Sequence, residues 1–231
     1  QLVMQTLVSL GIEVIDLGIS TTPTVEIAVP AEKAAGGIII TASHNPREWN
    51  ALKLLNEKGE FIDAAVGARV LALADLQSFN FSSVEKLGKI ISKNYLEQHV
   101  EAVLNYPLVK KEIISKKKLK VVVDAINSTG ATYVPALLRA LGVEEITVIN
   151  ETVNGQFAHN PEPLPEHLRQ LCEEVVRQGA DLGIAVDPDV DRLCFVNEDG
   201  TLFGEEYTLV AVADHVLKTK TGATVSNLSS T

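Results

Sequence analysis

Two short polar segments carry the residues whose types and spacing could do chemistry. Residues 41–46 contain a serine followed directly by a histidine, Ser43 and His44. Residues 187–192 contain three aspartates at alternate positions and end on an arginine. Each segment follows an apolar run typical of a buried strand, and ligands collect beyond the carboxyl ends of strands in α/β sheets. A hydroxyl nucleophile at one strand end and carboxylates at another indicate metal-assisted phosphoryl transfer.

The three aspartates are the stronger of the two signals. Carboxylates this close together repel one another, which raises their pKa values unless a cation neutralises them. Alternate spacing in an extended loop lets Asp187, Asp189 and Asp191 point into one cage of oxygen ligands, which suits Mg²⁺. A solvated acidic turn is the ordinary alternative, but an apolar strand on each side argues against it. A calcium EF-hand is excluded, because Arg192 stands where that loop needs glycine and the flanks resemble strands.

Ser43 has two interpretations from its position alone. Serine is common in turns and at helix caps, where its hydroxyl satisfies backbone donors. The neighbouring side chains favour a functional role, because His44 could act as an acid, a base or a phosphate donor and Pro46 stiffens the turn. A cap and a nucleophile both remain open at this point.

Two cations accompany these segments. Arg192 could hold the aspartate loop by ion pairing, or reach a phosphate through its bidentate fork. Lys53 follows Ser43 by ten residues, and its spacing alone suggests an ordinary surface lysine. The proline-rich residues 159–163 are interpreted as an architectural loop.

Strands alternate with helices along the chain, which predicts a parallel α/β fold. Pro23 falls near the first turn of a helix that follows a turn at residues 18–22, and Pro30 predicts a kink or a later start. The other predicted helices cover residues 1–10, 64–76, 94–104, 131–141, 166–178 and 205–217. The predicted strands cover residues 13–17, 37–41, 52–55, 60–62, 119–125, 146–149, 182–186, 193–197 and 223–226.

These elements predict three successive regions. Residues 1–104 form the first, residues 105–199 the second, and residues 200–231 open a third. A lysine-rich run at residues 110–120 marks the first boundary, as a solvated linker or helix face rather than a phosphate site. The first two regions repeat the same βαβ order of elements, and each has one reactive loop, which indicates a diverged internal repeat.

Composition narrows the class of protein. The chain has 231 residues, is 46% hydrophobic and carries a net charge of −10. An acidic protein lacks the basic surface of a nucleic-acid binder, and no apolar run is long enough to span a membrane. Two cysteines without a paired motif and no leader peptide predict a cytoplasmic protein. Both ends look cut, so we expect a piece of a longer chain.

The two segments together resemble the α-D-phosphohexomutases, the family of phosphoglucomutase, phosphomannomutase and phosphoglucosamine mutase. Residues 41–46 with 49–53, and residues 187–192, match its serine and aspartate motifs. The family often has glycine where Pro188 and Val190 stand. The resemblance implies successive three-layer α/β domains with mixed, mostly parallel sheets. It also implies four domains, of which this chain holds most of the first, all of the second and the start of the third.

The resemblance implies a role for each site residue. Ser43 is the phosphoserine, and Asp187, Asp189 and Asp191 hold Mg²⁺, which also contacts the Ser43 oxygen or its phosphate. His44, Lys53 and Arg192 supply positive charge or proton transfer. The implied reaction converts a hexose 1-phosphate into a hexose 6-phosphate through a hexose 1,6-bisphosphate. Without the third and fourth domains, we expect the chain alone to be inactive.

Two other functions remain open. A phosphatase of the haloacid dehalogenase type would use Asp187 as its nucleophile and leave Ser43 without a role. A non-catalytic module would bind a metal or a sugar phosphate only. The mutase interpretation makes a geometric prediction that the others do not: Ser43 must meet the aspartates across the boundary between the first two regions.

Overall fold

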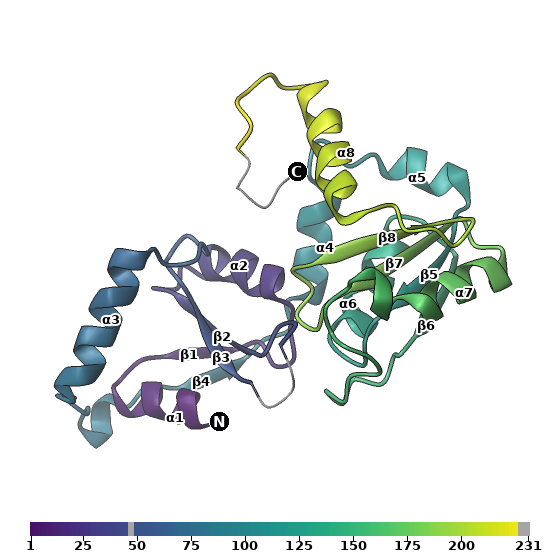
Figure 1. The fold of residues 1–231 in the computed structure, drawn as a ribbon. Helices are drawn as coiled ribbons and strands as arrows, with labels where there is room; N and C mark the ends of the chain where they lie inside the picture. The colour runs from purple at the N-terminus through teal and green to yellow at the C-terminus, as the bar shows by residue number, and fades with distance from the viewer. Residues whose placement is uncertain (46–48, 226–231) are drawn as a thin grey trace. The chain divides into compact units, whose positions relative to one another are not determined.

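The computed structural model describes residues 1–45 and 49–225, which divide into two compact units (Figure 1). The first unit comprises Gln1–Ile40 and Leu52–Glu97, and the second comprises Thr41–Ala51 and Gln98–Thr231. The loop that carries Ser43 therefore packs as part of the second unit, although it follows a strand of the first. Pro46, expected to stiffen this loop, lies outside the described residues.

The first unit contains two small sheets. Strand β1 pairs with β4 in parallel, and β2 pairs with β3. Its elements are α1 (Leu2–Ser9), β1 (Val14–Asp16), α2 (Thr22–Ala31), β2 (Gly37–Thr41), β3 (Ala51–Leu55), α3 (Ala64–Leu76), a 3₁₀ turn (Val84–Lys86) and β4 (Ile90–Ser92). Helix α2 packs against β2 and β3 through a small core of Val29, Ile39 and Leu55.

Helix α2 illustrates how the local sequence sets an element. The Thr21 hydroxyl accepts a hydrogen bond from the Thr24 N–H at 3.2 Å, and a proline stands in the first turn, where its missing N–H costs nothing. The helix begins at Thr22, so the expected later start is wrong. Pro30 lies in the last turn, one residue before the helix ends.

The second unit is built on a four-stranded sheet of order β6-β5-β7-β8. Strands β6, β5 and β7 are parallel, and β8 runs antiparallel to β7. Its elements are α4 (Leu96–Leu104), α5 (Lys111–Lys117), β5 (Lys120–Asp124), α6 (Gly130–Ala140), β6 (Glu145–Ile149), a 3₁₀ turn (Pro165–His167), α7 (Arg169–Gln178), β7 (Leu182–Val186), β8 (Leu193–Asn197) and α8 (Glu205–Leu217).

Helices cover both faces of this sheet, which gives three layers (Figure 1). Val122 of β5 packs with Leu171 and Val175 of α7 in one core cluster. Its neighbours Val121 and Val123 belong to a second cluster with side chains of α6. Successive side chains of a strand point to opposite faces, so the continuous valine run of β5 fills both cores. The predicted α/β fold with a mixed, mostly parallel sheet is confirmed.

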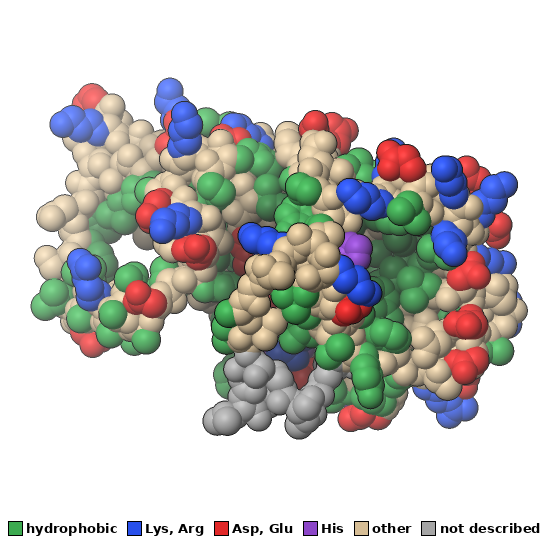
Figure 2. Space-filling view, turned by 90° about the horizontal axis from the view of Figure 1, so that it is seen from above, with side chains coloured by type: hydrophobic (Ala, Val, Ile, Leu, Met, Phe, Trp, Pro, Cys, Tyr) green, Lys and Arg blue, Asp and Glu red, His purple; other side chains and the backbone are tan. Residues whose placement is uncertain are grey.

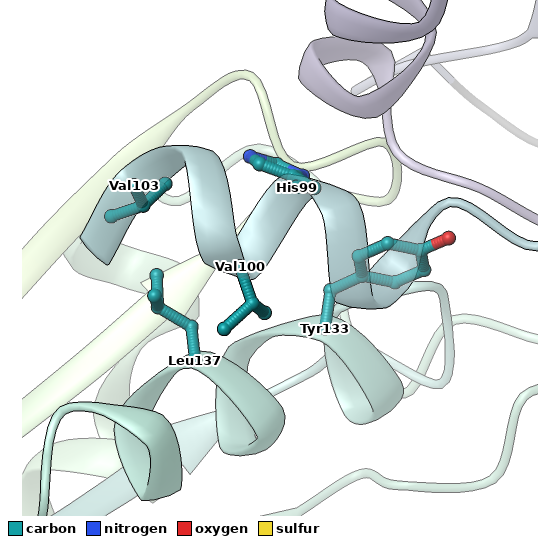
Figure 3. Close-up of a pocket in the computed structure, with 5 residues that line it drawn as sticks. All are labelled: His99, Val100, Val103, Tyr133 and Leu137. Atoms are coloured by element: carbon teal, nitrogen blue, oxygen red, sulfur yellow. The ribbon is translucent and has the colours of Figure 1, made fainter. Parts of the chain in front are cut away.

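Helix α4 packs across α6 and leaves a pocket between them (Figure 3). Val100 and Leu137 face one another across it, and the rings of His99 and Tyr133 lie 6.4 Å apart. Burial lowers the pKa of His99. The remaining lining residue is Val103, so this pocket is mainly apolar.

Several predicted elements differ from the structure. The lysine-rich run forms helix α5, in agreement with its interpretation as a helix face, whereas β4 was not predicted because its short sequence has no clear alternation. Residues 60–62 form no strand beyond a single bridge at Phe61. Residues 223–225 are not a strand, and Ser226 lies outside the described residues.

Figure 2 shows acidic and basic side chains interspersed over the face in view. Among residues 1–45 and 49–225, no helix is both long enough and apolar enough to cross a membrane.

Candidate functional site: an acidic loop facing a serine

The three aspartates lie on the connection between β7 and β8. Asp187 and Asp189 are buried and Asp191 is exposed, yet one carboxylate oxygen from each lies within 4.8 Å of the others. The hairpin between two antiparallel strands brings the alternating carboxylates together, as their spacing predicts. This cluster is open on one side and closed by protein on the other.

Asp187 is the electrostatic centre of the cluster. Burial and the negative charge of Asp189 raise its pKa to about 7, against hydrogen bonding from the Arg192 backbone that lowers it. A buried carboxylate beside another carboxylate is stabilised either by a proton or by a cation. Oxygen ligands in this number are the donor set of Mg²⁺ and Ca²⁺, so Asp187, Asp189 and Asp191 could hold such an ion.

Backbone bonds fold the acidic loop around Asp187. Its Oδ1 accepts the N–H groups of Asp191 and Arg192, each at 3.0 Å. Val190 adopts a φ of +60°, which is strained for a β-branched residue. Glycine adopts this conformation without strain. Val190 therefore has a backbone conformation that favours glycine, the residue that the resembled family often has at this position.

Two hydroxyl groups hold the same loop from β5 and α6. The Ser128 Oγ donates to the Pro188 carbonyl oxygen at 2.8 Å, and the Thr129 Oγ1 donates to it at 2.7 Å. Pro188 is buried, and a buried carbonyl is costly to leave without a donor. These two residues fix the acidic loop to the sheet.

Ser43 lies directly against this cluster. It is 8% exposed and has a φ of +51°, a left-handed conformation that is uncommon for serine. Its Oγ donates to Asp187 Oδ2 at 3.1 Å. The hydroxyl therefore points at a carboxylate, and the loop turn is made instead by the Ser43 N–H donating to Thr41 Oγ1 at 2.8 Å. Strain of this kind gathers at functional sites.

His44 and Arg192 extend the contact between the two loops. Arg192 Nη2 lies 3.3 Å from His44 Nε2, and His44 Nδ1 lies 3.3 Å from Ser43 Oγ. Arginine only donates, so His44 Nε2 accepts and its proton sits on Nδ1. His44 then donates to Ser43 Oγ, which in turn donates to Asp187. The protons of the four side chains form one directional chain.

A proline-rich loop contacts Arg192 from the other side. Arg192 Nη1 donates to Glu162 Oε1 at 2.8 Å, although residues 159–163 were interpreted as architectural. The same loop is fixed by His159, whose Nε2 bonds to Asp124 Oδ2 at 2.8 Å. Burial lowers the pKa of His159, but Asp124 and the Asn160 carbonyl raise it by more, so the net shift is upward.

Lys53 lies on β3 in the first unit. Its Nζ is 6.0 Å from the centroid of the Phe61 ring. The residues that the second unit brings together are thus Ser43, His44, Arg192 and the three aspartates. The contributions of Glu162, Ser128 and Thr129 were not predicted. The sequence offered one indication for Glu162, the proline on each side of it.

Two family models match the chain in succession. Residues 1–81 match phosphoglucomutase/phosphomannomutase, alpha/beta/alpha domain I, and residues 94–200 match domain II of the same family. Together they cover most of the chain and contain every site residue named above.

Proteins of similar sequence have names that agree with these family models. The chain is 38% identical to a phosphoglucomutase/phosphomannomutase of Thermococcus kodakarensis over 94% of its own length and 47% of the relative. It is 33% identical to a probable phosphoglucosamine mutase of Methanopyrus kandleri, again over 94% of this chain and 47% of the relative. The chain therefore spans about half the length of these relatives.

Solved structures share the fold. A putative phosphomannomutase from Thermus thermophilus aligns with a TM-score of 0.79 at 25% identity, over 92% of this chain and 48% of that one. A phosphoglucomutase/phosphomannomutase family protein from Burkholderia thailandensis aligns with a TM-score of 0.77 at 26% identity, over 93% of this chain and 46% of that one. The paired serine and aspartate loops, the two domain models and these relatives agree, and the chain belongs to the phosphoglucomutase/phosphomannomutase family.

Proposed function

We propose that this chain carries the phosphoryl-transfer centre of a hexose-phosphate mutase. Ser43 holds the transferable phosphoryl group, and a hydroxyl of a hexose 1-phosphate takes it as the bond from phosphorus to serine breaks. The resulting hexose 1,6-bisphosphate turns over and returns its other phosphoryl group to Ser43, leaving a hexose 6-phosphate. The observation that carries the proposal is the 3.1 Å hydrogen bond from Ser43 Oγ to Asp187 within the carboxylate cluster.

Asp187, Asp189 and Asp191 would hold Mg²⁺ in this proposal, with Ser43 or its phosphate as a further ligand. When bound, the ion neutralises charge that develops on the transferring phosphoryl group. Arg192 and His44 add hydrogen-bond donors next to Ser43, where they stabilise the same charge. Lys53 is proposed as a further cation of the site.

The direct test is phosphorylation of Ser43. The longer protein that contains this chain is incubated with glucose 1,6-bisphosphate and Mg²⁺, and the modified residue is identified by peptide mass spectrometry. We expect one phosphate on Ser43, and none in a Ser43→Ala variant. Phosphate on Asp187 instead would favour the phosphatase mechanism. Binding of the sugar phosphate without any phosphorylation would favour a non-catalytic module.

The sugar remains to be assigned between two classes. Relatives named phosphoglucomutase/phosphomannomutase favour glucose and mannose phosphates, and relatives named probable phosphoglucosamine mutase favour glucosamine phosphate. We infer that the residues which choose among them lie in the half of the relatives that this chain does not span. Steady-state assays of the longer protein with the three 1-phosphates would assign the substrate.

We further propose that the chain alone does not catalyse turnover. The resemblance assigns the sugar-specificity loop and the phosphate-binding loop to the third and fourth domains. Conversion of glucose 1-phosphate to glucose 6-phosphate is expected to be at background with residues 1–231 alone. Efficient conversion by this chain would contradict the proposal.

A further inference from the structure

The loop that links β6 to α7 reaches the site at one residue, Glu162. Proline stands on both sides of it, and both prolines are buried while Glu162 remains partly exposed. Proline fixes φ and removes a backbone donor, so the segment has little freedom. Its carboxylate therefore presents a fixed acceptor to Arg192, which it meets at 2.8 Å.

The loop is tied to the sheet just before Glu162. Asp124, at the end of β5, accepts from the Asn150 side chain at 2.9 Å and from the Ile126 N–H at 3.1 Å. His159 bonds to its second oxygen, and the other ring nitrogen bonds to the Asn160 carbonyl at 2.8 Å. The Glu162 N–H then donates to the Asn160 side chain at 3.1 Å. A continuous set of bonds thus runs from the sheet to Glu162.

The ion pair between Glu162 and Arg192 contributes little to the stability of the fold. The two side chains are 34% and 37% exposed, and exposed pairs contribute little to folding. Orientation is the better explanation. One edge of the guanidinium is occupied by Glu162, and the other edge is thereby directed to His44.

Arg192 also has an alternative set of partners close by. It follows Asp191 directly and donates its backbone N–H to Asp187. A guanidinium released from Glu162 would be attracted to this carboxylate cluster, because close opposite charges favour one another. It would then compete with a cation for the same oxygens and leave the side of Ser43 that His44 occupies.

We propose that Glu162 is a positioning residue that holds the Arg192 side chain on the Ser43 side of the site and away from the three aspartates. The expected effect of Glu162 on the rate of Ser43 phosphorylation rests on the proposed function. The expected effect of Glu162 on cation binding does not, because cation binding depends only on the carboxylates and on the position of Arg192. The two readouts therefore separate failure of one proposal from failure of the other.

The experiment compares Glu162→Gln with Arg192→Gln and with the double variant, using Mn²⁺ alone as the probe in isothermal titration calorimetry. We expect Glu162→Gln to weaken Mn²⁺ binding by about tenfold, a size typical of coupled neighbouring residues. In the Arg192→Gln background the same change should weaken it by less than about twofold, because no guanidinium is left to compete. Glu173→Gln is the matched control, since it breaks an exposed pair with Arg169, and should leave binding unchanged.

The second readout is the rate of Ser43 phosphorylation by glucose 1,6-bisphosphate with saturating Mg²⁺. Glu162→Gln should slow it by about tenfold, Glu162→Asp should recover part of the loss, and the double variant should match Arg192→Gln. Equal effects of Glu162→Gln on Mn²⁺ binding in both backgrounds would overturn the positioning role. If Mn²⁺ binding follows the expected pattern while no variant is phosphorylated, the positioning role stands and the mutase proposal fails.

Discussion

The acidic loop and the serine loop of this protein belong to the same compact unit but are held in different ways. The acidic loop is bonded to the sheet through its own backbone: Asp187 accepts two N–H groups, and the Pro188 carbonyl accepts two hydroxyls. The serine loop meets it through side chains, from Ser43 to Asp187 and from His44 to Arg192. A fixed cluster of carboxylates thus faces a nucleophile that is oriented by its contacts with that cluster.

This difference separates the tasks that the two loops perform in the proposed mechanism. The carboxylates must keep one geometry through both phosphoryl transfers, because the distance between ligand oxygens sets which ion fits. The serine must present first a phosphoryl group and then a free hydroxyl. Changes in the serine loop should therefore alter chemistry, and changes under the acidic loop should alter stability and cation binding together.

The largest effect is expected at Ser43. Ser43→Ala removes the acceptor oxygen, so incorporation of phosphate from glucose 1,6-bisphosphate should fall to background in a mass spectrometric assay. Cation binding should change little, because the three carboxylates remain. If Ser43→Ala also abolished Mn²⁺ binding, the separation of tasks between the two loops would be wrong.

Asp187→Asn should have the next largest effect. The variant keeps the side-chain shape and removes the central charge, so phosphorylation of Ser43 should slow by about 10²–10³-fold. Mn²⁺ affinity measured by calorimetry should fall with it. Asp181→Asn, one residue before β7 and outside the cluster, serves as the control. Normal phosphorylation in Asp187→Asn would exclude the cation site from the mechanism.

The pH dependence of cation binding should follow the protonation of Asp187. The pKa of Asp187 is raised to about 7, so protons compete with the cation below that pH and affinity should rise as pH increases through it. The apo protein behaves in the opposite way. A carboxylate with a raised pKa stabilises the fold while protonated, so stability should fall as pH rises toward 7 and recover on addition of Mn²⁺. A Mn²⁺ affinity that is flat between pH 5 and pH 8 would contradict the electrostatic account.

Loss of the two hydroxyls that bond to the acidic loop should have a smaller effect, on the free energy of unfolding. Ser128→Ala or Thr129→Val alone leaves one hydroxyl on the Pro188 carbonyl, and each should have a minor effect. The double variant leaves that buried oxygen without either donor, which should lower the free energy of unfolding by about 1–3 kcal/mol in urea denaturation. Thr132→Val, on an exposed position of α6, is the control. Strictly additive single effects would show that the two hydroxyls do not share one task.

The smallest effect is expected at His159. Its pKa is raised by Asp124 and the Asn160 carbonyl over the opposing effect of burial. A raised histidine pKa contributes stability that is complete below its usual value of 6.5 and is lost as pH rises through the raised value. His159→Asn should therefore destabilise the protein by about 1 kcal/mol near pH 5.5 and by less at pH 9, as measured by thermal unfolding. Equal destabilisation at both pH values would mean that the charge on His159 contributes nothing.

The acidic loop could be predicted from the sequence because its signal is local. Alternation of Asp187, Asp189 and Asp191 between two apolar strands determines both the hairpin and the cluster. A strand was likewise predicted over residues 119–125, where β5 lies, and α3 and β7 have the bounds that were predicted. In each case the residues that decide the structure are neighbours in the chain.

Other features depend on partners that are distant in the chain. Ser43 bonds to a residue 144 positions away, so its local sequence left both a cap and a nucleophile open. Glu162 meets Arg192 across 30 positions, and the prolines beside it indicated a rigid loop but not its partner. Strand β4 is exposed along its three residues, so it lacks the alternation by which a strand is predicted.

In the proposed mechanism, the serine and the three aspartates form one site for a phosphoryl group and a cation. The most direct measurement is the ³¹P NMR signal of phosphorylated Ser43 during titration with Mn²⁺, a paramagnetic probe for the proposed Mg²⁺ site. A cation at the carboxylates should broaden this signal beyond detection at stoichiometric Mn²⁺, and Asp189→Asn should restore it. A phosphoserine signal that stays sharp when Mn²⁺ is bound would place the ion away from Ser43 and contradict the account.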